Sequence, residues 1–166
     1  MKRYRITVFA LFGLLLLFAL VKLLDYFAIG ISYQGTASMP EGYYLTYPVG
    51  AIRRGDVVLF QPDSKLQRYI LKRGWLQKPI PLLKEVVGIP GDWLCIEDKV
   101  VYINKHKIAI IKTRDNKNRP LAHFHFCGRI PPSNYFLEGI SDPDSFDSRY
   151  YGLIDKTQIL SKAVRL

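Results

Sequence analysis

The sequence has only two cysteines and three histidines among its 166 residues, so few side chains are available to build a metal centre. It contains no zinc-finger spacing, no arginine-rich arm and no aromatic RNA-binding signature, which argues against a nucleic-acid partner. Acidic residues are also scarce: 14 Asp and Glu face 24 Lys and Arg, a net charge of +10. With nucleic acid disfavoured, this charge indicates either a solvated basic surface or contact with anionic lipid head groups.

Charge is absent from residues 6–21, ITVFALFGLLLLFALV. A membrane-spanning helix needs about 20 apolar residues, a length that this run attains if Lys22 extends its amine toward the membrane surface. A cleaved signal peptide is the alternative, but no convincing Ala-x-Ala site follows. We therefore predict an uncleaved transmembrane anchor at 6–29. The basic residues before it predict that segment 1–5 is cytoplasmic and that domain 30–166 lies outside the cytoplasm.

The two cysteines, Cys95 and Cys127, form an even pair within a domain that is predicted to be exported. Exported proteins reach oxidising compartments, so the pair predicts a disulfide. The alternative is that both are small buried apolar residues.

Short apolar runs separated by turn residues follow the anchor, and they predict a mostly-β domain closed or coiled on itself. The expected strands lie within residues 42–50, 53–62, 82–92, 92–96, 99–104, 107–111, 122–128, 134–140 and 158–166. The hairpin between the fourth and fifth of these turns around Glu97 and Asp98. Residues 64–73 have helical spacing, with Ser64 as the expected N-cap and Gly74 as the end. Residues 112–120, KTRDNKNRP, are expected to form an exposed loop.

Ser38 lies in GTASMPEGYY at 35–44, where glycine and proline make a surface turn the ordinary interpretation. A nucleophilic serine would need a neighbouring base. His123 and His125 alternate along AHFHFCG and share a face with Cys127, a pattern that can bind zinc. No fourth ligand is evident, and the polar face of a strand explains the pattern more simply. We therefore predict no metal.

Lysine is the other candidate base, and it works only when burial lowers its pKa enough to leave it neutral. Lys84 fits this requirement because it stands between Leu82-Leu83 and Val86-Val87 in an apolar strand. Alternation along the strand places Lys84 on the face of Leu82 and Val86. An edge-strand lysine that limits aggregation is the alternative.

Three segments in order resemble the signature boxes of the type I signal peptidases, the membrane-bound Ser/Lys proteases. They are SMP at 38–40, LLKEVVGIPGD at 82–92 and SFDSRYYG at 145–152. Arg73-Gly74-Trp75-Leu76 and Pro81-Leu82-Leu83-Lys84 further resemble the conjugative-transfer branch of that family, which is TraF-like. The resemblance covers roughly residues 30–166. It implies a signal-peptidase-type coiled β-sheet catalytic domain, tethered to the bacterial inner membrane with the domain in the periplasm, and no cofactor.

By position in these boxes, the resemblance implies that Ser38 is the nucleophile and Lys84 its general base. Thr36 and the Ser38 backbone N–H would form the oxyanion hole, a group of donors that stabilises negative charge on the substrate oxygen.

Four further residues receive supporting roles from the same resemblance. Ser145 would orient the lysine amine, and an ion pair between Asp147 and Arg149 would fix the segment that carries Ser145. Met39 would line the substrate pocket.

Two segments depart from the family pattern. Glu85 follows Lys84 where the family usually has Lys-Arg, and residues 139–143 replace a Gly-Asp-Asn opening. Neither departure is expected to touch a catalytic group.

The expected substrate is an extended segment of an exported protein with small residues before the cut. In the conjugative branch this is a pilin precursor, and some members join its new ends into a circle. The expected partners are therefore a protein substrate, the lipid membrane and other components of conjugation or secretion. The alternatives are a general signal peptidase, a non-catalytic membrane-tethered scaffold of a secretion complex, and a soluble repressor-type Ser/Lys self-cleaving protein, which the anchor disfavours.

Overall fold

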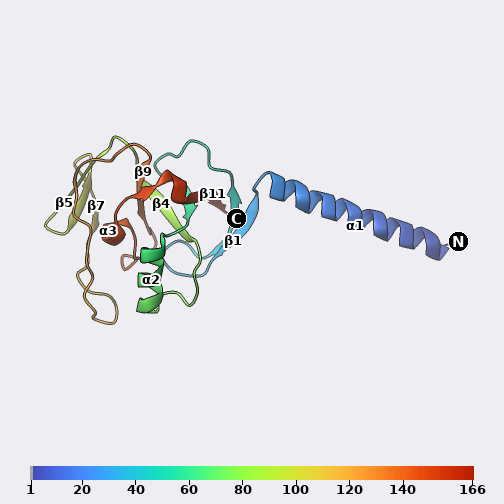
Figure 1. Ribbon diagram of the computed structural model, residues 1–166, viewed down its shortest axis with the longest axis horizontal. Helices are drawn as coiled ribbons and strands as arrows, with labels where there is room; N and C mark the ends of the chain where they lie inside the picture. The colour runs from blue at the N-terminus through green and yellow to red at the C-terminus, as the bar shows by residue number, and fades with distance from the viewer. Residues whose placement is uncertain (1) are drawn as a thin grey trace.

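The N-terminal helix α1 (Lys2–Tyr26) extends away from a β-rich body in Figure 1. The computed structural model describes residues 2–166, except for the side chains of 2–8, 10, 25 and 26. The predicted cytoplasmic segment 1–5 lies outside the described side chains. Large apolar side chains of α1 from Phe9 to Leu24 are exposed. Within the fully described residues, no helix is long and apolar enough to cross a membrane.

The larger of two antiparallel sheets in the described chain has seven strands. Their spatial order is β1 (Gly30–Gln34), β2 (Gly42–Tyr47), β11 (Ile159–Arg165), β3 (Val57–Phe60), β4 (Leu82–Gly88), β9 (Asn134–Glu138) and β10 (Ile154–Asp155). The last strand, β11, pairs with both β2 and β3, so the C-terminus lies beside β2, on the side of the body from which α1 extends (Figure 1). Strand β4 lies between β3 and β9, so Lys84 is not on an edge strand and the aggregation-limiting alternative does not apply.

The smaller sheet has the order β7 (His106–Ile110), β6 (Val100–Ile103), β5 (Trp93–Glu97) and β8 (Cys127–Arg129) in the described chain. The turn of the β5–β6 hairpin is at Asp98 and Lys99, both with positive φ, one residue later than predicted. Together the two sheets confirm the predicted mostly-β domain.

The strand predicted at 122–128 is present only from Cys127. Residues 122–126 are irregular because their backbone bonds go to two different elements: Phe124 N–H donates to Arg149 O, and Phe126 O accepts from Ile96 N–H. The predicted alternation nevertheless survives in the side chains. The rings of Phe124 and Phe126 stack 5.6 Å apart against the core, whereas His125 is exposed.

Helix α2 (Ser64–Arg73) has the predicted bounds, and Gly74 ends it in the left-handed conformation at φ 72°. The N-cap differs from the prediction. Asp63, not Ser64, caps the helix, because its Oδ1 accepts from Leu66 N–H at 2.7 Å. Two short helices, α3 (Ser148–Tyr151) and the 3₁₀-helix η1 (Lys156–Gln158), follow β9 in the chain.

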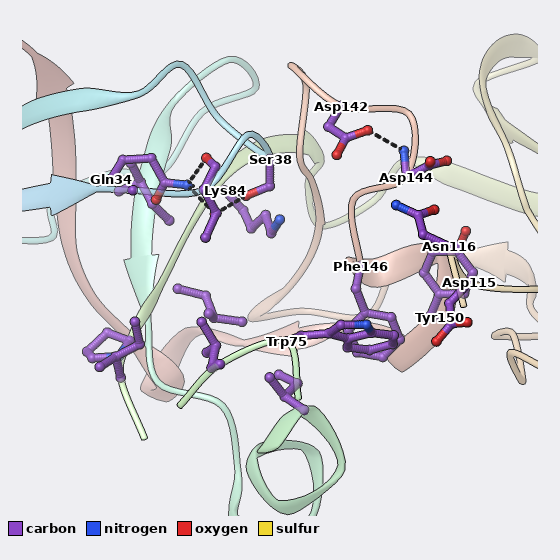
Figure 2. Close-up of a pocket in the computed structure, with 18 of the residues that line it drawn as sticks. Gln34, Ser38, Trp75, Lys84, Asp115, Asn116, Asp142, Asp144, Phe146 and Tyr150 are labelled. Atoms are coloured by element: carbon purple, nitrogen blue, oxygen red, sulfur yellow. Dashed lines mark hydrogen bonds between the residues drawn. The ribbon is translucent and has the colours of Figure 1, made fainter. Parts of the chain in front are cut away.

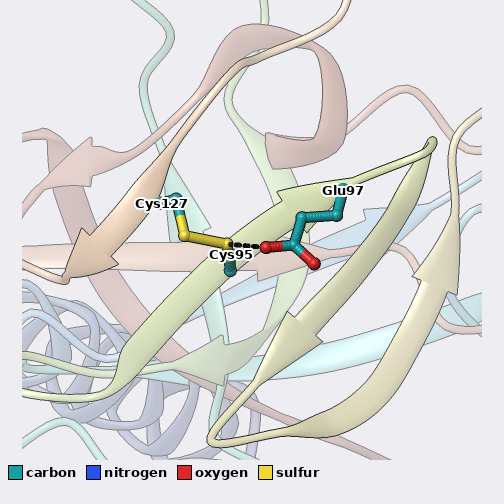
Figure 3. A group of neighbouring side chains, drawn as sticks. All are labelled: Cys95, Glu97 and Cys127. Atoms are coloured by element: carbon teal, nitrogen blue, oxygen red, sulfur yellow. Dashed lines mark hydrogen bonds between the residues drawn. A yellow bond between two sulfur atoms is a disulfide. The ribbon is translucent and has the colours of Figure 1, made fainter.

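Cys95 of β5 and Cys127 of β8 lie directly opposite each other and form the disulfide that the even cysteine pair predicts (Figure 3). Glu97 Oε1 lies 3.1 Å from Cys95 Sγ. A sulfur in a disulfide is not a thiolate ligand. The zinc alternative, which needed Cys127 beside His123 and His125, is therefore not supported.

Candidate active site

A cavity of about 360 Å³ opens on one side of the larger sheet (Figure 2). Ser38 and Lys84 line it at one end, and the rings of Trp75, Phe146 and Tyr150 line it at the other (Figure 2). Its walls between them are largely apolar and include Leu59, Ile70, Leu76, Ile80, Leu82, Leu83 and Leu121. Side chains from the predicted exposed loop 112–120 form part of the rim. The cavity combines apolar walls with polar groups, at the Ser38 and Lys84 end and along the side formed by Asp115, Asn116 and Asp144, which is typical of a binding site.

Lys84 is the buried amine of this cavity, with 3% of the residue exposed. Its Nζ donates to Ser145 Oγ at 2.6 Å. Burial lowers the lysine pKa to about 8, and the nearby Asp147 carboxylate opposes this effect. A lysine with this pKa is partly neutral near pH 8, so Lys84 can accept a proton where an ordinary lysine cannot.

Ser38 lies in the turn between β1 and β2 and is half-buried. Its Oγ is 3.3 Å from Thr36 Oγ1 and 3.4 Å from Gln34 Nε2. Ser38 and Lys84 line the same cavity, but the described residues include no hydrogen bond between Ser38 Oγ and Lys84 Nζ. Catalytic hydrogen bonds are often long without substrate and shorten in the complex. The structure thus brings together the predicted nucleophile, its base and the predicted oxyanion donor Thr36.

Asp147 and Arg149 form a buried ion pair that holds the Ser145 segment. Arg149 Nε and Nη2 donate to the two carboxylate oxygens of Asp147 at 2.7 and 2.8 Å. The same guanidinium donates to the backbone carbonyl of Ser145 at 3.0 Å, and Asp147 Oδ2 accepts from Gly139 N–H at 3.1 Å. The pair therefore fixes the backbone at Gly139 and at Ser145, the residue that accepts the hydrogen bond from Lys84.

Met39 is placed differently from the prediction. It is 1% exposed and packs with Tyr44, Leu83 and Ala163 in the core, and it is not among the side chains that line the described cavity. Ser38 lines the cavity, whereas its neighbour Met39 is buried in the core.

Of the two departures from the family pattern, loop 139–143 touches the predicted nucleophile, contrary to the prediction, whereas Glu85 acts on the neighbouring Glu138. Ser141 N–H donates to the backbone carbonyl of Ser38 at 3.3 Å, so loop 139–143 contacts the predicted nucleophile. Glu85 lies opposite Glu138 across β4 and β9. Burial raises the pKa of Glu138 to about 7, and the neighbouring Asp147 and Glu85 charges add to this, while its charge also acts on Lys84.

Sequence reasoning missed the role of Gly139. A Cβ at this position would lie 2.1 Å from Ser145 Oγ and 2.8 Å from Lys84 Nζ. Only glycine leaves room for the Lys84–Ser145 hydrogen bond. The glycine at the start of the third box was the available signal, but its reason is visible only when β4 and β9 are placed side by side.

Comparison with known sequences assigns this chain to a protein family. The pattern of the family described as "Signal peptidase, peptidase S26" matches residues 2–166. The chain belongs to this family.

Relatives of the chain include members named for signal peptide processing and one named for conjugation. Signal peptidase I of Bacillus caldolyticus is 28% identical over 129 residues, which are 71% of this chain and 63% of that protein. Signal peptidase I of Bacillus licheniformis is 30% identical, and the match covers 67% of this chain and 56% of the relative. The chain thus spans about three fifths of these two relatives.

Conjugal transfer protein TraF of Agrobacterium fabrum is 32% identical over 124 residues, which are 68% of this chain and 67% of that protein. It bears out the predicted TraF-like branch. A crystal structure of a signal peptidase I from Enterococcus faecalis matches with a TM-score of 0.39 and 21% identity, over 67% of this chain and 95% of the other.

Proposed function

We propose that this protein is a serine endopeptidase that cleaves exported precursor proteins by acyl transfer, with Ser38 as nucleophile and Lys84 as general base. The observation that carries the proposal is the buried Lys84 amine, whose pKa is about 8, in the same cavity as the Ser38 hydroxyl. A membrane-tethered scaffold has no need for a buried lysine at the end of an open groove.

The reaction would begin when neutral Lys84 removes the proton from Ser38 Oγ. The oxygen then attacks the carbonyl carbon of the scissile bond. The Ser38 backbone N–H and the Thr36 hydroxyl donate to the resulting oxyanion, and removing one such donor typically costs roughly 3 kcal/mol of transition-state stabilisation. Protonated Lys84 returns its proton to the leaving amine. Lys84 then deprotonates water, which attacks the ester carbonyl, and the protonated amine returns this proton to Ser38 Oγ as the acyl group leaves.

Ser145, Asp147 and Arg149 would act on this reaction through position alone. The Ser145 hydroxyl sets the direction of the Lys84 amine, and the Asp147–Arg149 pair holds the backbone of Ser145. Preorganised groups need not rearrange during the reaction, which is where much of their contribution to the rate arises.

We further propose that helix α1 anchors the domain in the bacterial inner membrane, with the N-terminus in the cytoplasm and residues 30–166 in the periplasm. Support comes from the uncharged run at 6–21 and from the exposed apolar side chains of α1. The disulfide between Cys95 and Cys127 agrees with an oxidising compartment.

The substrate we propose is a conjugative pilin precursor, and the similarity to a conjugal transfer protein supports this choice. The relatives named signal peptidase I support a second candidate, the removal of signal peptides from secreted proteins in general. An extended peptide could enter the groove and pair with the backbone of neighbouring strand segments.

Mass spectrometry of a candidate pilin precursor incubated with the full chain tests both functions. A single cut that disappears in Ser38→Ala and in Lys84→Ala supports the peptidase. A product lighter by one water than the linear fragment would reveal a circle. If the general substrate is correct, secreted precursors unrelated to pilin are cleaved equally well. A cut that survives in both variants would overturn the roles of Ser38 and Lys84, and the absence of any cut by the unsubstituted chain would favour a non-catalytic scaffold.

A further inference from the structure

Gln34 is a buried polar residue that no part of the proposed reaction uses. It is the last residue of β1, is 9% exposed and lies directly before the turn that carries Ser38. Figure 2 places its side chain on the Ser38 and Lys84 side of the cavity. Its Nε2 lies 2.7 Å from the backbone carbonyl oxygen of Thr36, 2.7 Å from Thr36 Oγ1 and 3.4 Å from Ser38 Oγ.

The chemistry of these partners fixes the orientation of the Gln34 amide. A backbone carbonyl can only accept a hydrogen bond, so the amide atom next to Thr36 O must be the nitrogen. The amide nitrogen carries two protons. One satisfies the Thr36 carbonyl and the other satisfies the Thr36 hydroxyl oxygen, both at short distance. The amide has no third proton to donate to Ser38 Oγ, which lies farther away at 3.4 Å.

This arrangement controls where the Thr36 hydroxyl proton points. A hydroxyl has one proton to donate and two lone pairs that accept. Because Gln34 donates to Thr36 Oγ1, one lone pair is occupied and the proton is directed away from Gln34. Ser38 Oγ, at 3.3 Å, is the nearby acceptor. The hydroxyl proton therefore faces the atom at which the reaction begins.

We propose that Gln34 is a positioning residue that sets the Thr36 hydroxyl as a donor toward the oxyanion, an inference that rests on the acyl-transfer function proposed above. The second N–H of the amide donates to the Thr36 carbonyl, which holds the amide so that its first N–H points at the Thr36 hydroxyl. When Ser38 Oγ attacks, the oxyanion forms next to it and receives the Thr36 proton. Gln34 never touches the substrate and acts through Thr36 alone.

Two substitutions separate this role from simple packing. Gln34→Met keeps the length of the side chain and removes the N–H donors without adding charge. Gln34→Glu keeps the shape of the side chain but replaces the N–H donors with carboxylate oxygens, which only accept. The Thr36 hydroxyl would then donate to this carboxylate and turn away from Ser38. Rates are measured on the full chain at a pH above the Lys84 pKa, so that an altered lysine pKa does not enter the comparison.

We expect Gln34→Met to lower kcat about 10-fold and Gln34→Glu about 100-fold, with KM unchanged, because one oxyanion donor contributes roughly 10²–10³ in kcat. Thr36→Val removes the donor itself. Since Gln34 acts only through it, Gln34→Met combined with Thr36→Val should be no slower than Thr36→Val alone. Thermal unfolding of each variant checks that the fold is retained.

A kcat of Gln34→Met equal to that of the unsubstituted protein would overturn the inference, as would a double variant whose loss equals the product of the two single losses. These results leave the proposed function intact as long as Ser38→Ala is inactive. An active Ser38→Ala would overturn both.

Discussion

The amine of Lys84 donates to the hydroxyl of Ser145 at 2.6 Å, across 61 positions of sequence. The two residues come from strand β4 and from the loop between β9 and α3. Because β4 and β9 are hydrogen-bonded neighbours, this contact follows from the sheet order. It holds the Lys84 amine in a fixed direction while burial lowers its pKa to about 8.

The rate of precursor cleavage should rise with pH and level off above the Lys84 pKa of about 8, because only the neutral amine accepts a proton. The measurement is kcat/KM between about pH 6 and pH 10. Glu138 also titrates near this range, with a pKa of about 7. The variant Glu138→Gln removes this second titration, and its kcat/KM should still rise with pH if Lys84 is the base. A flat profile in both proteins would exclude Lys84 as the base.

Lys84→Met should raise the free energy of unfolding at pH 7. A folded pKa of about 8 against 10.5 in the unfolded chain means that the charged lysine destabilises the fold by about 3 kcal/mol below pH 8. Losing the partner of Ser145 offsets about 1 kcal/mol, which leaves a net gain of about 2 kcal/mol.

The pH dependence checks the sign of this effect. Between pH 8 and 10.5 the unfolded state binds more protons at Lys84, so the stability of the unsubstituted protein rises with pH and the advantage of the variant disappears. Chemical denaturation at neutral and at alkaline pH measures both values. Lys78→Met, at an exposed position, is the control. A variant that is less stable than the unsubstituted protein at neutral pH would contradict the account.

Gly139→Ala should lower kcat/KM at least 100-fold and cost about 1–3 kcal/mol of stability, since the new methyl group would displace Ser145 and Lys84. Gly50→Ala is the matched control because nothing lies within 4 Å of its Cβ position. Cleavage rates and unfolding curves of the two variants test this. Equal activity in the two variants would mean that the close approach at Gly139 is unimportant.

Asp147→Asn should cost about 3–5 kcal/mol of stability, because it leaves the Arg149 charge buried without its partner. Asp144→Asn provides the comparison, since it breaks the much more exposed ion pair with Lys112 and should cost less than about 1 kcal/mol. Denaturant midpoints give both values. Similar costs at the two positions would contradict a supporting role for the buried pair.

The parts of the site that sequence could predict are those carried by short local patterns. Ser38, Lys84 and Ser145 were each predicted from a box of a few residues, and the apolar neighbours of Lys84 already indicated its burial. Helix α2 was predicted with its bounds, because periodicity and Gly74 are local signals.

Contacts between distant loops could not be predicted. The Ser141 N–H reaches Ser38 only because the segment after β9 folds over the β1–β2 turn, and the Glu85–Glu138 pair depends on strand register. Met39 was assigned to the pocket by the family resemblance, but it packs in the core, and a resemblance of short boxes does not show which side chains a turn buries. The strand predicted at 122–128 begins too early compared with β8, because the alternation in this segment reflects packing against the core rather than pairing in a sheet.

The central claim is that Ser38 attacks the substrate, and the cleavage rate of Ser38→Ala on a precursor that the unsubstituted full chain processes is its most direct test. The account predicts a rate at least about 10³-fold lower, with the fold and precursor binding retained, because alanine has no hydroxyl to attack the carbonyl carbon. Ser64→Ala, at the exposed start of α2, should cleave at the normal rate. A Ser38→Ala protein that still cleaves as fast as the unsubstituted one would contradict the account.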